Sequence, residues 1–375
     1  ENIPSGEFSK IVSRLGGQDN AFTGHDVTSY FQRISKDRLR KVMEMEADRM
    51  ANLKLVDKEV LTERDVILEE RRSRIENNPA AILDEQMDAS LYLHHPYGVP
   101  VIGWEHEMAQ LSREHAMNFY ERYYAPNNAI LVVAGDVTPE EVKNHAVETF
   151  GKLPANPAAP RAARPADPPQ RVARRVMLED PRAGKASIHR DYLVPAYATA
   201  APLEAEALDL LAKIALDGPT SRLYKKLVVE EKVASSTGGS YMGSGLDSGK
   251  FSLYAVAADG TDLTKVESAM DAVLAEVAAN GVTAAELERA KNGYVAEYIY
   301  ENDNQASLAR RFGWGLSLGR SIAQIESWPD EIRKVSLDDV KSAAAKYIDA
   351  RRSVTGLLKP LKAPLAEANP AKSRS

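Results

Sequence analysis

The chain has 375 residues, 44% of them hydrophobic and 27% charged, and a formal net charge of −6. This length supports two ordinary domains with separate cores, and the acidic balance argues against nucleic acid as a partner, because such binding needs a concentrated basic surface. No apolar run approaches the roughly 18 residues of a membrane-spanning helix, so we expect no membrane span. Without cysteine, any zinc site must consist of His, Asp and Glu.

The first residue is Glu1 rather than a methionine. Such a start is typical of a processed or truncated chain, so the sequence gives no information on a preceding signal peptide. The cellular compartment stays open on this evidence.

Helical and strand periodicities alternate over the first 150 residues. The methionines at helical spacing are expected in the core, and His94 and His95, whose side chains diverge, are expected in a loop rather than at a metal. Asp57 is predicted to cap a helix rich in glutamate, residues 57–77. The predicted elements are a helix 6–14, a hairpin of strands 18–22 and 27–34, helices 39–50, 57–77 and 80–92, a buried strand 129–134 and a helix 139–150.

Six prolines among alanines and arginines indicate a linker over residues 154–170. This linker separates a first domain, 1–153, from a second, 171–360, which is followed by a flexible tail, 361–375. The second domain repeats the order of the first and adds a strand and a helix before its hairpin. The sequence therefore predicts a duplicated α+β unit whose first copy lacks its beginning. The predicted elements are strands 187–193, 236–242 and 249–257, helices 201–216 and 262–279, and an acidic helix after 281.

Three carboxylates, Glu59, Glu63 and Glu70, share one narrow face of the first acidic helix. Like charges on adjacent turns repel each other unless a cation or hydrogen-bond donors lie among them. One interpretation is a metal ligand with a supporting carboxylate seven residues away. The other is a solvated acidic face whose charges pair with nearby arginines, Arg64, Arg71 and Arg72.

Several segments resemble the M16 metallopeptidases, the insulinase and pitrilysin clan, in its short type with two homologous domains per chain. The resemblance implies an α+β fold of two M16-type domains, each a mostly antiparallel sheet covered by helices. The segments are 16–23 (GGQDNAFT), 46–50 (EADRM), 63–70 (ERDVILEE), 95–98 (HPYG), 123–129 (YYAPNNA), 135–137 (GDV) and 221–224 (SRLY).

In that family, two histidines of an inverted HxxEH helix and a glutamate on a later helix hold Zn2+. The resemblance places this metal-ligating glutamate at Glu70 and a supporting glutamate of the catalytic site at Glu63. It also places a substrate-binding edge strand at Asn20, Ala21 and Phe22, to which an extended peptide adds by backbone hydrogen bonds. The alternative for these three residues is an ordinary hairpin strand.

The sequence departs from the family pattern in two places. It contains no HxxEH; the near match at 111–115, LSREH, is expected to be the start of a surface helix, and family spacing would place the motif directly before Glu1. The family's substrate clamp, an Arg and a Tyr seven residues apart, falls on Val228 and Ser235. These departures imply a zinc-bearing chain whose partner is a second M16 subunit with the clamp, or another copy of itself.

The resemblance thus implies a zinc metalloendopeptidase subunit that cleaves peptides or unfolded polypeptides in a chamber formed by its two domains and a partner. Without the motif, the chain as given is expected to be inactive. The alternative is a non-catalytic M16-like subunit that binds peptides and presents them to a catalytic partner. Retention of Glu63 and Glu70 favours the first. Resemblance to exported bacterial members suggests the periplasm, with the cytoplasm as the alternative.

Overall fold

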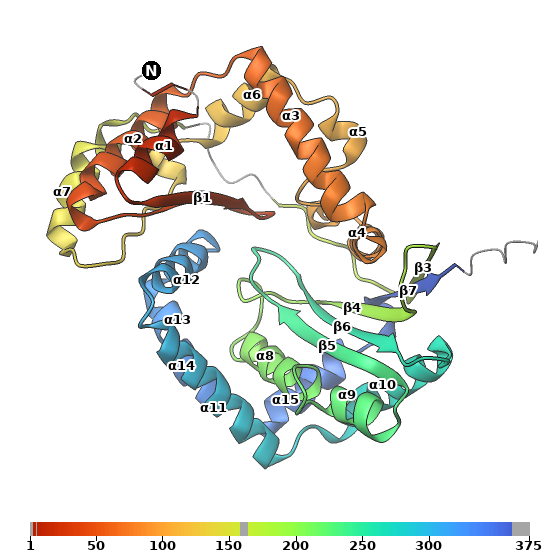
Figure 1. Ribbon diagram of the computed structural model, residues 1–375. Helices are drawn as coiled ribbons and strands as arrows, with labels where there is room; N and C mark the ends of the chain where they lie inside the picture. Colours follow the sequence, from red (N-terminus) through yellow and green to blue (C-terminus); the bar gives the residue numbers. More distant parts are fainter. Residues whose placement is uncertain (1–2, 5, 158–163, 362–375) are drawn as a thin grey trace, which may run out of the picture.

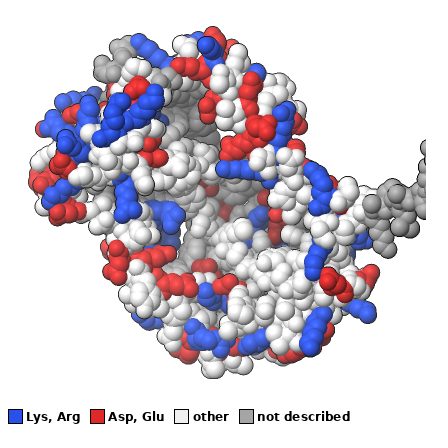
Figure 2. All heavy atoms as spheres, viewed as in Figure 1, with Lys and Arg blue, Asp and Glu red and all other residues white. Residues whose placement is uncertain are grey.

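The structure is a computed structural model that describes residues 3–4, 6–157 and 164–361. Two halves face each other, and Figure 2 shows a hollow between them, with charges of both signs interspersed around it. The predicted tail lies outside the described residues, apart from Leu361, and so does part of the predicted linker. In the described ranges, no helix combines the length and the apolar character needed to cross a bilayer.

The first half is mainly helical and holds one antiparallel hairpin (Figure 1). Local sequence signals set its boundaries: Gly16 at φ +76° follows the first helix, and the Asn78 side chain accepts hydrogen bonds from the first amides after Pro79. Its elements are α1 (Glu7–Arg14), β1 (Gln18–Thr23), β2 (Thr28–Arg33), α2 (Leu39–Asn52), α3 (Asp57–Arg71), α4 (Pro79–Leu91), α5 (Glu105–Met108), α6 (Arg113–Tyr123) and α7 (Pro139–Glu148).

Two predictions for this half are wrong. Residues 129–134 form no strand, and Ile130 and Leu131 are exposed, because within the described ranges no strand lies beside them to pair with. Asp57 is the first residue of α3 rather than its cap; Val56 holds the cap position, without a side-chain hydrogen bond. The helical path continues beyond α3 in a π turn (Arg72–Glu76), close to the predicted end.

The second half contains a five-stranded sheet in the order β3-β7-β4-β6-β5, in which only β3 and β7 pair in parallel. The predicted strands and the helices 201–216 and 262–279 are confirmed, whereas β3 and β7 were not predicted. The elements are β3 (Arg174–Asp180), β4 (Ser187–Val194), α8 (Glu204–Ala215), α9 (Arg222–Tyr224), a π turn (Lys225–Glu230), β5 (Ala234–Met242), β6 (Gly249–Ala257), α10 (Leu263–Asn280), α11 (Ala284–Glu301), α12 (Gln305–Ser317), α13 (Ile322–Glu326), α14 (Trp328–Lys334), α15 (Leu337–Tyr347) and β7 (Ser353–Pro360).

The two faces of this sheet are covered by helices from different halves of the chain. Because side chains alternate along a strand, neighbouring residues of β7 point to opposite faces. Leu357 belongs to the main core of the second half, with α8, α10 and α15, whereas Leu358 belongs to a second cluster with Leu83 and Met87 of α4. Helix α4 of the first half therefore closes the sheet of the second half.

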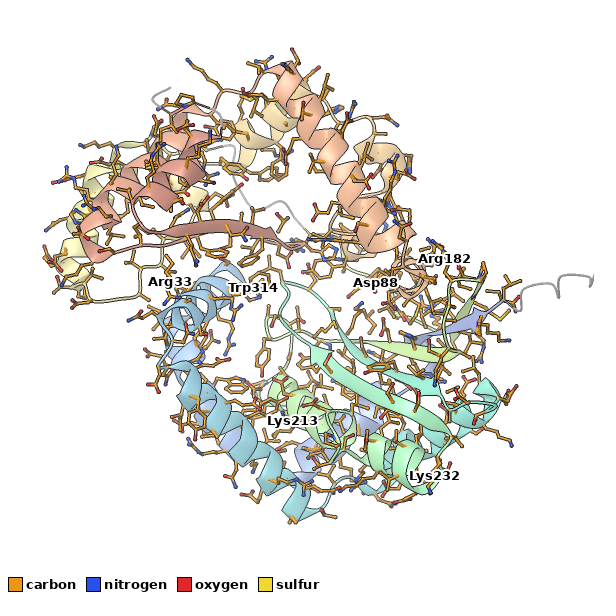
Figure 3. The ribbon with its side chains drawn as sticks, in the orientation of Figure 1. Arg33, Asp88, Arg182, Lys213, Lys232 and Trp314 are labelled. Carbon is orange, nitrogen blue, oxygen red and sulfur yellow. The ribbon has the colours of Figure 1, made fainter. Side chains whose placement is uncertain are left out.

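Helix α12 of the second half makes the reciprocal contact with the first. Trp314 packs its ring 5.7 Å from that of Phe22 on β1, and Figure 3 shows it where α12 approaches the hairpin. A Cβ placed on Gly313 would lie 3.6 Å from Val132, in the segment that forms no strand. Each half thus contributes one helix to the other.

The two docking contacts are equivalent positions of the repeat. Asn78 and Asn304 cap α4 and α12, and Ser112 and Ser336 cap α6 and α15, each by accepting backbone amides. Counted from these caps, Met87 corresponds to Gly313 and Val132 to Gly356. A Cβ on Gly356 would lie 2.2 Å from Met87 Sδ. In one contact the helix carries the large residue, Met87, and its neighbour is Gly356; in the other the helix carries Gly313 and its neighbour is Val132.

A polar junction joins the halves beside these helices. The Tyr97 hydroxyl donates to Asp26 and accepts the Leu246 amide of the β5–β6 loop at 3.0 Å. Burial, and then the Asp26 carboxylate, raise the pKa of Tyr97 to about 12. Arg164 of the linker bonds Asp26 at 2.7 Å, and His95, placed in a loop as predicted, lies 3.0 Å from Asp247.

Substituting Gly356→Ala should lower the free energy of unfolding by about 1 to 3 kcal/mol, because the new methyl group meets Met87 in a filled interface. Met87→Ala should lower the free energy of unfolding less in the Gly356→Ala variant than in the wild type, and the two losses should differ by at least about 1 kcal/mol. Urea denaturation measures both values.

Gly184→Ala is the control, since nothing lies within 4 Å of its Cβ position, and it should be neutral. Additive losses at positions 87 and 356 would contradict the docking contact.

A buried polar cluster lies inside the second half. The Tyr197 hydroxyl donates to Asp209 of α8 and accepts Trp328 Nε1–H at 2.6 Å. Burial raises the pKa of Asp209 to about 7. Because the folded state favours the protonated acid, this group lowers the stability of the fold as the pH rises from about 4 to 7.

Asp209→Asn removes this titration and keeps an oxygen that accepts the Tyr197 hydrogen bond. The free energy of unfolding of the variant relative to wild type should therefore increase by about 2 to 4 kcal/mol between pH 4 and pH 8. Thermal unfolding at several pH values measures it, with Asp217→Asn, whose side chain is 52% exposed, as the control. A difference that is independent of pH would refute the assignment.

Candidate metal and peptide-binding site

The acidic face of α3 is only lightly paired. Glu63 is exposed and has no hydrogen bond or ion pair with a described residue, and Glu70 bonds only Arg74, at 2.7 Å. The arginines expected to pair with this face do so with other groups: Arg64 bonds Asp65, and Arg72 bonds Glu69. The prediction that Arg64, Arg71 and Arg72 pair with Glu59, Glu63 and Glu70 is therefore wrong.

Arg71 is buried, which the sequence did not indicate. It approaches Glu85 of α4 and Glu76 of the π turn, each at 2.8 Å, and donates to the Gly103 carbonyl at 2.7 Å. The Glu85 hydrogen bond raises the pKa of Arg71. This contact fixes the end of α3 against α4 and so positions the neighbouring Glu70. An arginine within a charged run carries no sequence signal for such burial.

The repeat relates α3 to α11. The residues at their N-cap positions, Val56 and Thr283, are 227 positions apart, whereas the caps of the next helices, Asn78 and Asn304, are 226 apart. The π turn after α3 takes up the extra residue. Along α3, Glu63 therefore corresponds to Ala290 and Glu70 to Glu297.

One counterpart contacts α8 and the other is buried. Glu297 Oε1 lies 3.2 Å from Lys213 Nζ of α8, and Ala290 belongs to the core of the second half. By the repeat, Glu70 lies towards the place in the first half that corresponds to α8. Within the ranges that the structure describes, no helix occupies that place.

A cavity of about 520 Å³ marks this place in the first half. Phe119 on its wall is 57% exposed, whereas its counterpart Ala343 is 5% exposed beneath α8. The near match to the zinc motif, 111–115, lies here and is confirmed as a helix start, with Ser112 accepting the His115 amide. The lining residues are Tyr30, Arg49, Leu53, Leu111, His115, Ala116, Phe119, Tyr120 and Tyr124. We call this cavity the α8-equivalent slot.

The described residues alone do not fit a zinc site. Zinc in proteins takes at least three side-chain ligands, and no three His, Asp or Glu side chains among residues 3–4, 6–157 and 164–361 are grouped to hold a metal. Helix α3 offers one or two carboxylates, next to a slot without further ligands of the right kind.

The strand β1 presents an unpaired edge. Among described strands it pairs only with β2, and its counterpart in the second half, β5, lies at the edge of the five-stranded sheet. Asn20 and Ala21 are exposed, and the Ala21 amide donates to the Asn20 side chain at 2.8 Å. Phe22 is held between Phe31 and Trp314. Such an edge can accept an extended peptide by backbone hydrogen bonds.

The positions matched to the family's clamp cannot bind a carbonyl in the clamp's manner. Val228 packs against the core of the second half, and the Ser235 hydroxyl donates weakly to the Val256 carbonyl at 3.4 Å. Neither side chain offers a guanidinium or a phenol.

Comparison with protein families and known proteins agrees with this architecture. Residues 1–104 match the model of insulinase (peptidase family M16), and residues 110–294 match that of the peptidase M16 inactive domain. Zinc protease PqqE of Helicobacter pylori is 29% identical over 96% of this chain and 80% of its own length, and an uncharacterized zinc protease of Mycobacterium leprae is 27% identical over 92% and 76%.

Solved structures have the same fold. A protease from Helicobacter pylori aligns with a TM-score of 0.88 and 28% identity over 96% of this chain and 86% of its own. A peptidase M16 inactive domain from Pseudomonas fluorescens aligns with a TM-score of 0.84 and 17% identity, over 96% and 85%. The predicted α+β fold of two M16-type domains is confirmed, and the chain belongs to the M16 family of peptidases.

Proposed function

We propose that this chain is the zinc-bearing subunit of an M16 endopeptidase. The observation that supports the proposal is that two carboxylates of α3, Glu63 and Glu70, have few partners among the described residues, and that Glu70 corresponds by the repeat to Glu297, which contacts α8 in the second half. Such carboxylates are available as metal ligands. Glu70 is the proposed Zn2+ ligand, and Glu63 the carboxylate that orients the ligands around the metal. The substrates are peptides or unfolded polypeptides.

The proposed peptide-binding strand is β1, at Asn20, Ala21 and Phe22. Because Phe22 packs on Trp314 of α12, a peptide on this edge lies between the two halves. Figure 2 shows a hollow between the two halves.

A second candidate function is a non-catalytic subunit that binds peptides and presents them to a catalytic partner. Two observations favour it: the second half matches a family model described as inactive, and the described residues hold no group of metal ligands. We prefer the first function because α3 retains two carboxylates, Glu63 and Glu70, that have few partners among the described residues. In either case the proposed partner is a second M16 subunit carrying the Arg and Tyr clamp, or another copy of this chain, and the proposed compartment is the periplasm.

Zinc binding by the complete translation product of the gene tests the first function. If the protein is periplasmic, this product is recovered in the osmotic-shock fraction. Glu70→Gln should reduce bound zinc to below about a tenth of the wild-type content and peptide cleavage by at least about 100-fold. Glu63→Gln should reduce cleavage by about 10- to 100-fold, with part of the zinc retained.

Glu69→Gln, one residue away with a side chain 72% exposed, is the matched control and should change neither quantity. Unchanged zinc and cleavage in the Glu70 variant would remove Glu70 as a ligand. If the wild-type product binds peptides, but does not bind zinc and does not cleave the peptides, the second function is favoured.

Backbone-modified peptides test the edge strand in both candidate functions. In a peptide that pairs with a strand, only alternate backbone amides face that strand. Methylating the nitrogens that face β1 should therefore weaken binding to the 375-residue chain by at least about tenfold. Methylating the other nitrogens should weaken binding much less. Fluorescence anisotropy measures the affinities. Equal losses in both registers would mean that the peptide does not bind as a strand. Ala21→Pro, which removes the amide facing the Asn20 side chain, should give a similar loss.

A further inference from the structure

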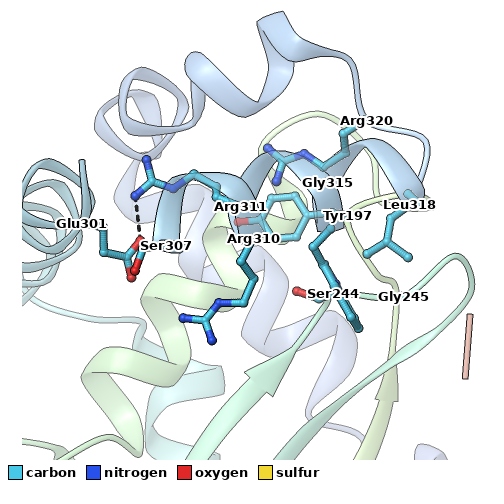
Figure 4. A pocket seen from close by; sticks show the side chains of 12 residues that line it. Tyr197, Ser244, Gly245, Glu301, Ser307, Arg310, Arg311, Gly315, Leu318 and Arg320 are labelled. Carbon is cyan, nitrogen blue, oxygen red and sulfur yellow. Dashed lines mark hydrogen bonds and ion pairs between the residues drawn. The ribbon is translucent and has the colours of Figure 1, made fainter. Parts of the chain in front are cut away.

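A separate cavity of about 270 Å³ lies in the second half beside α12 (Figure 4). Its walls come from α12, from the segment after β4 and from the β5–β6 loop. The residues that matter for its chemistry are Tyr197, Ser244, Arg310, Arg311, Trp314 and Arg320. Aromatic rings and guanidinium groups thus surround one small space.

The three arginines of the cavity differ in their partners. Arg311 is neutralised by Glu301 at 2.6 Å and lies 3.7 Å from the ring centre of Tyr298. Arg320 lies over the Tyr197 ring at 4.8 Å and donates to the Gln324 carbonyl. Arg310 has no hydrogen bond or ion pair with any residue in the described ranges and points away from the Arg311 pair (Figure 4).

The cavity is therefore positively charged in an acidic protein. Its lining holds three guanidinium groups and one carboxylate, against a net charge of −6 for the chain. Two further carboxylates lie outside the lining: Asp209, which accepts the Tyr197 hydroxyl, and Glu206, and burial raises the pKa of both. An anion that enters meets the free guanidinium of Arg310, whose geometry suits a carboxylate.

The position of the cavity connects it to the peptide-binding strand. Trp314 lines the cavity and also packs on Phe22 of β1. Gly245, on the opposite wall, lies beside Tyr97 of the junction between the halves, where a Cβ on it would be 3.1 Å from the hydroxyl. The cavity thus lies next to the contact between α12 and β1, separated from Phe22 by Trp314, and its volume of about 270 Å³ has room for a side chain or a chain end.

We propose that this cavity is a specificity site for a carboxylate of the bound peptide, with Arg310 as the charge-pairing residue and Trp314 and Tyr197 as apolar walls. It makes the chain prefer peptides that carry an acidic side chain or a free C-terminal carboxylate near the segment paired with β1. This inference rests on the proposed peptide binding at β1 and specifies the substrate class.

The test uses the 375-residue chain and short fluorescein-labelled peptides with one Glu at successive positions, each matched by the Gln peptide and by the same peptide with an amidated C-terminus. Arg310→Gln should weaken binding of the acidic peptides by about fivefold to tenfold and leave the peptides with neither carboxylate unchanged. If Arg310→Gln no longer weakens binding when Glu is replaced by Gln, the cavity binds the side-chain carboxylate. If it no longer weakens binding when the C-terminus is amidated, the cavity binds the C-terminal carboxylate.

Arg289→Gln is the control, because Arg289 of α11 is also exposed and also without an ion pair in the described ranges, yet lies outside the cavity. Equal effects of Arg310→Gln on acidic and neutral peptides, or no effect, would overturn the site. If neutral peptides bind with the register dependence of a strand but show no acidic preference, only the carboxylate site falls. If no peptide binds, the binding at β1 falls with it.

Discussion

The structure depends on a reciprocal exchange of helices between its two halves. Helix α4 closes the open face of the second sheet, and α12 lies against the hairpin and the unpaired segment of the first half. Leu83 and Met87 of α4 share a core cluster with Leu358 of the second sheet, whereas α12 contacts the first half through Trp314 and Gly313. The exchanged large and small residues at Met87–Gly356 and Gly313–Val132 show that one packing solution is used twice, with the sizes reversed.

This exchange gives the functional surfaces their positions. It brings Trp314 against Phe22, and so places the positively charged cavity beside the edge of β1. The Arg71–Glu85 ion pair also fixes the end of α3 to α4, next to Glu70. In the second half the place that matches the α8-equivalent slot is filled by α8, whose Asp209 accepts a hydrogen bond from Tyr197.

The sequence predicted what local signals determine. Glycine after α1, Asn78 before Pro79 and the alternation in β5 and β6 act within a few residues, so those elements were correct. The run 129–134 was misjudged because an apolar run becomes a strand only beside a partner strand. The buried Arg71 and the crossing of α4 depend on contacts between distant segments, which no single-sequence pattern reports. The shared helical face singled out Glu63 and Glu70 as acidic neighbours, whereas their assigned roles and the β1 edge came from family resemblance.

In the proposed function, α3 and the α8-equivalent slot are two parts of one metal site. An anomalous difference map at the zinc edge, from crystals of the complete translation product grown with zinc, tests this arrangement. We expect one strong peak about 2.0 to 2.2 Å from a Glu70 carboxylate oxygen, with a helix in the slot supplying the other ligands. Zinc bound elsewhere, or a filled slot with the Glu70 carboxylate still paired only with Arg74, would contradict it.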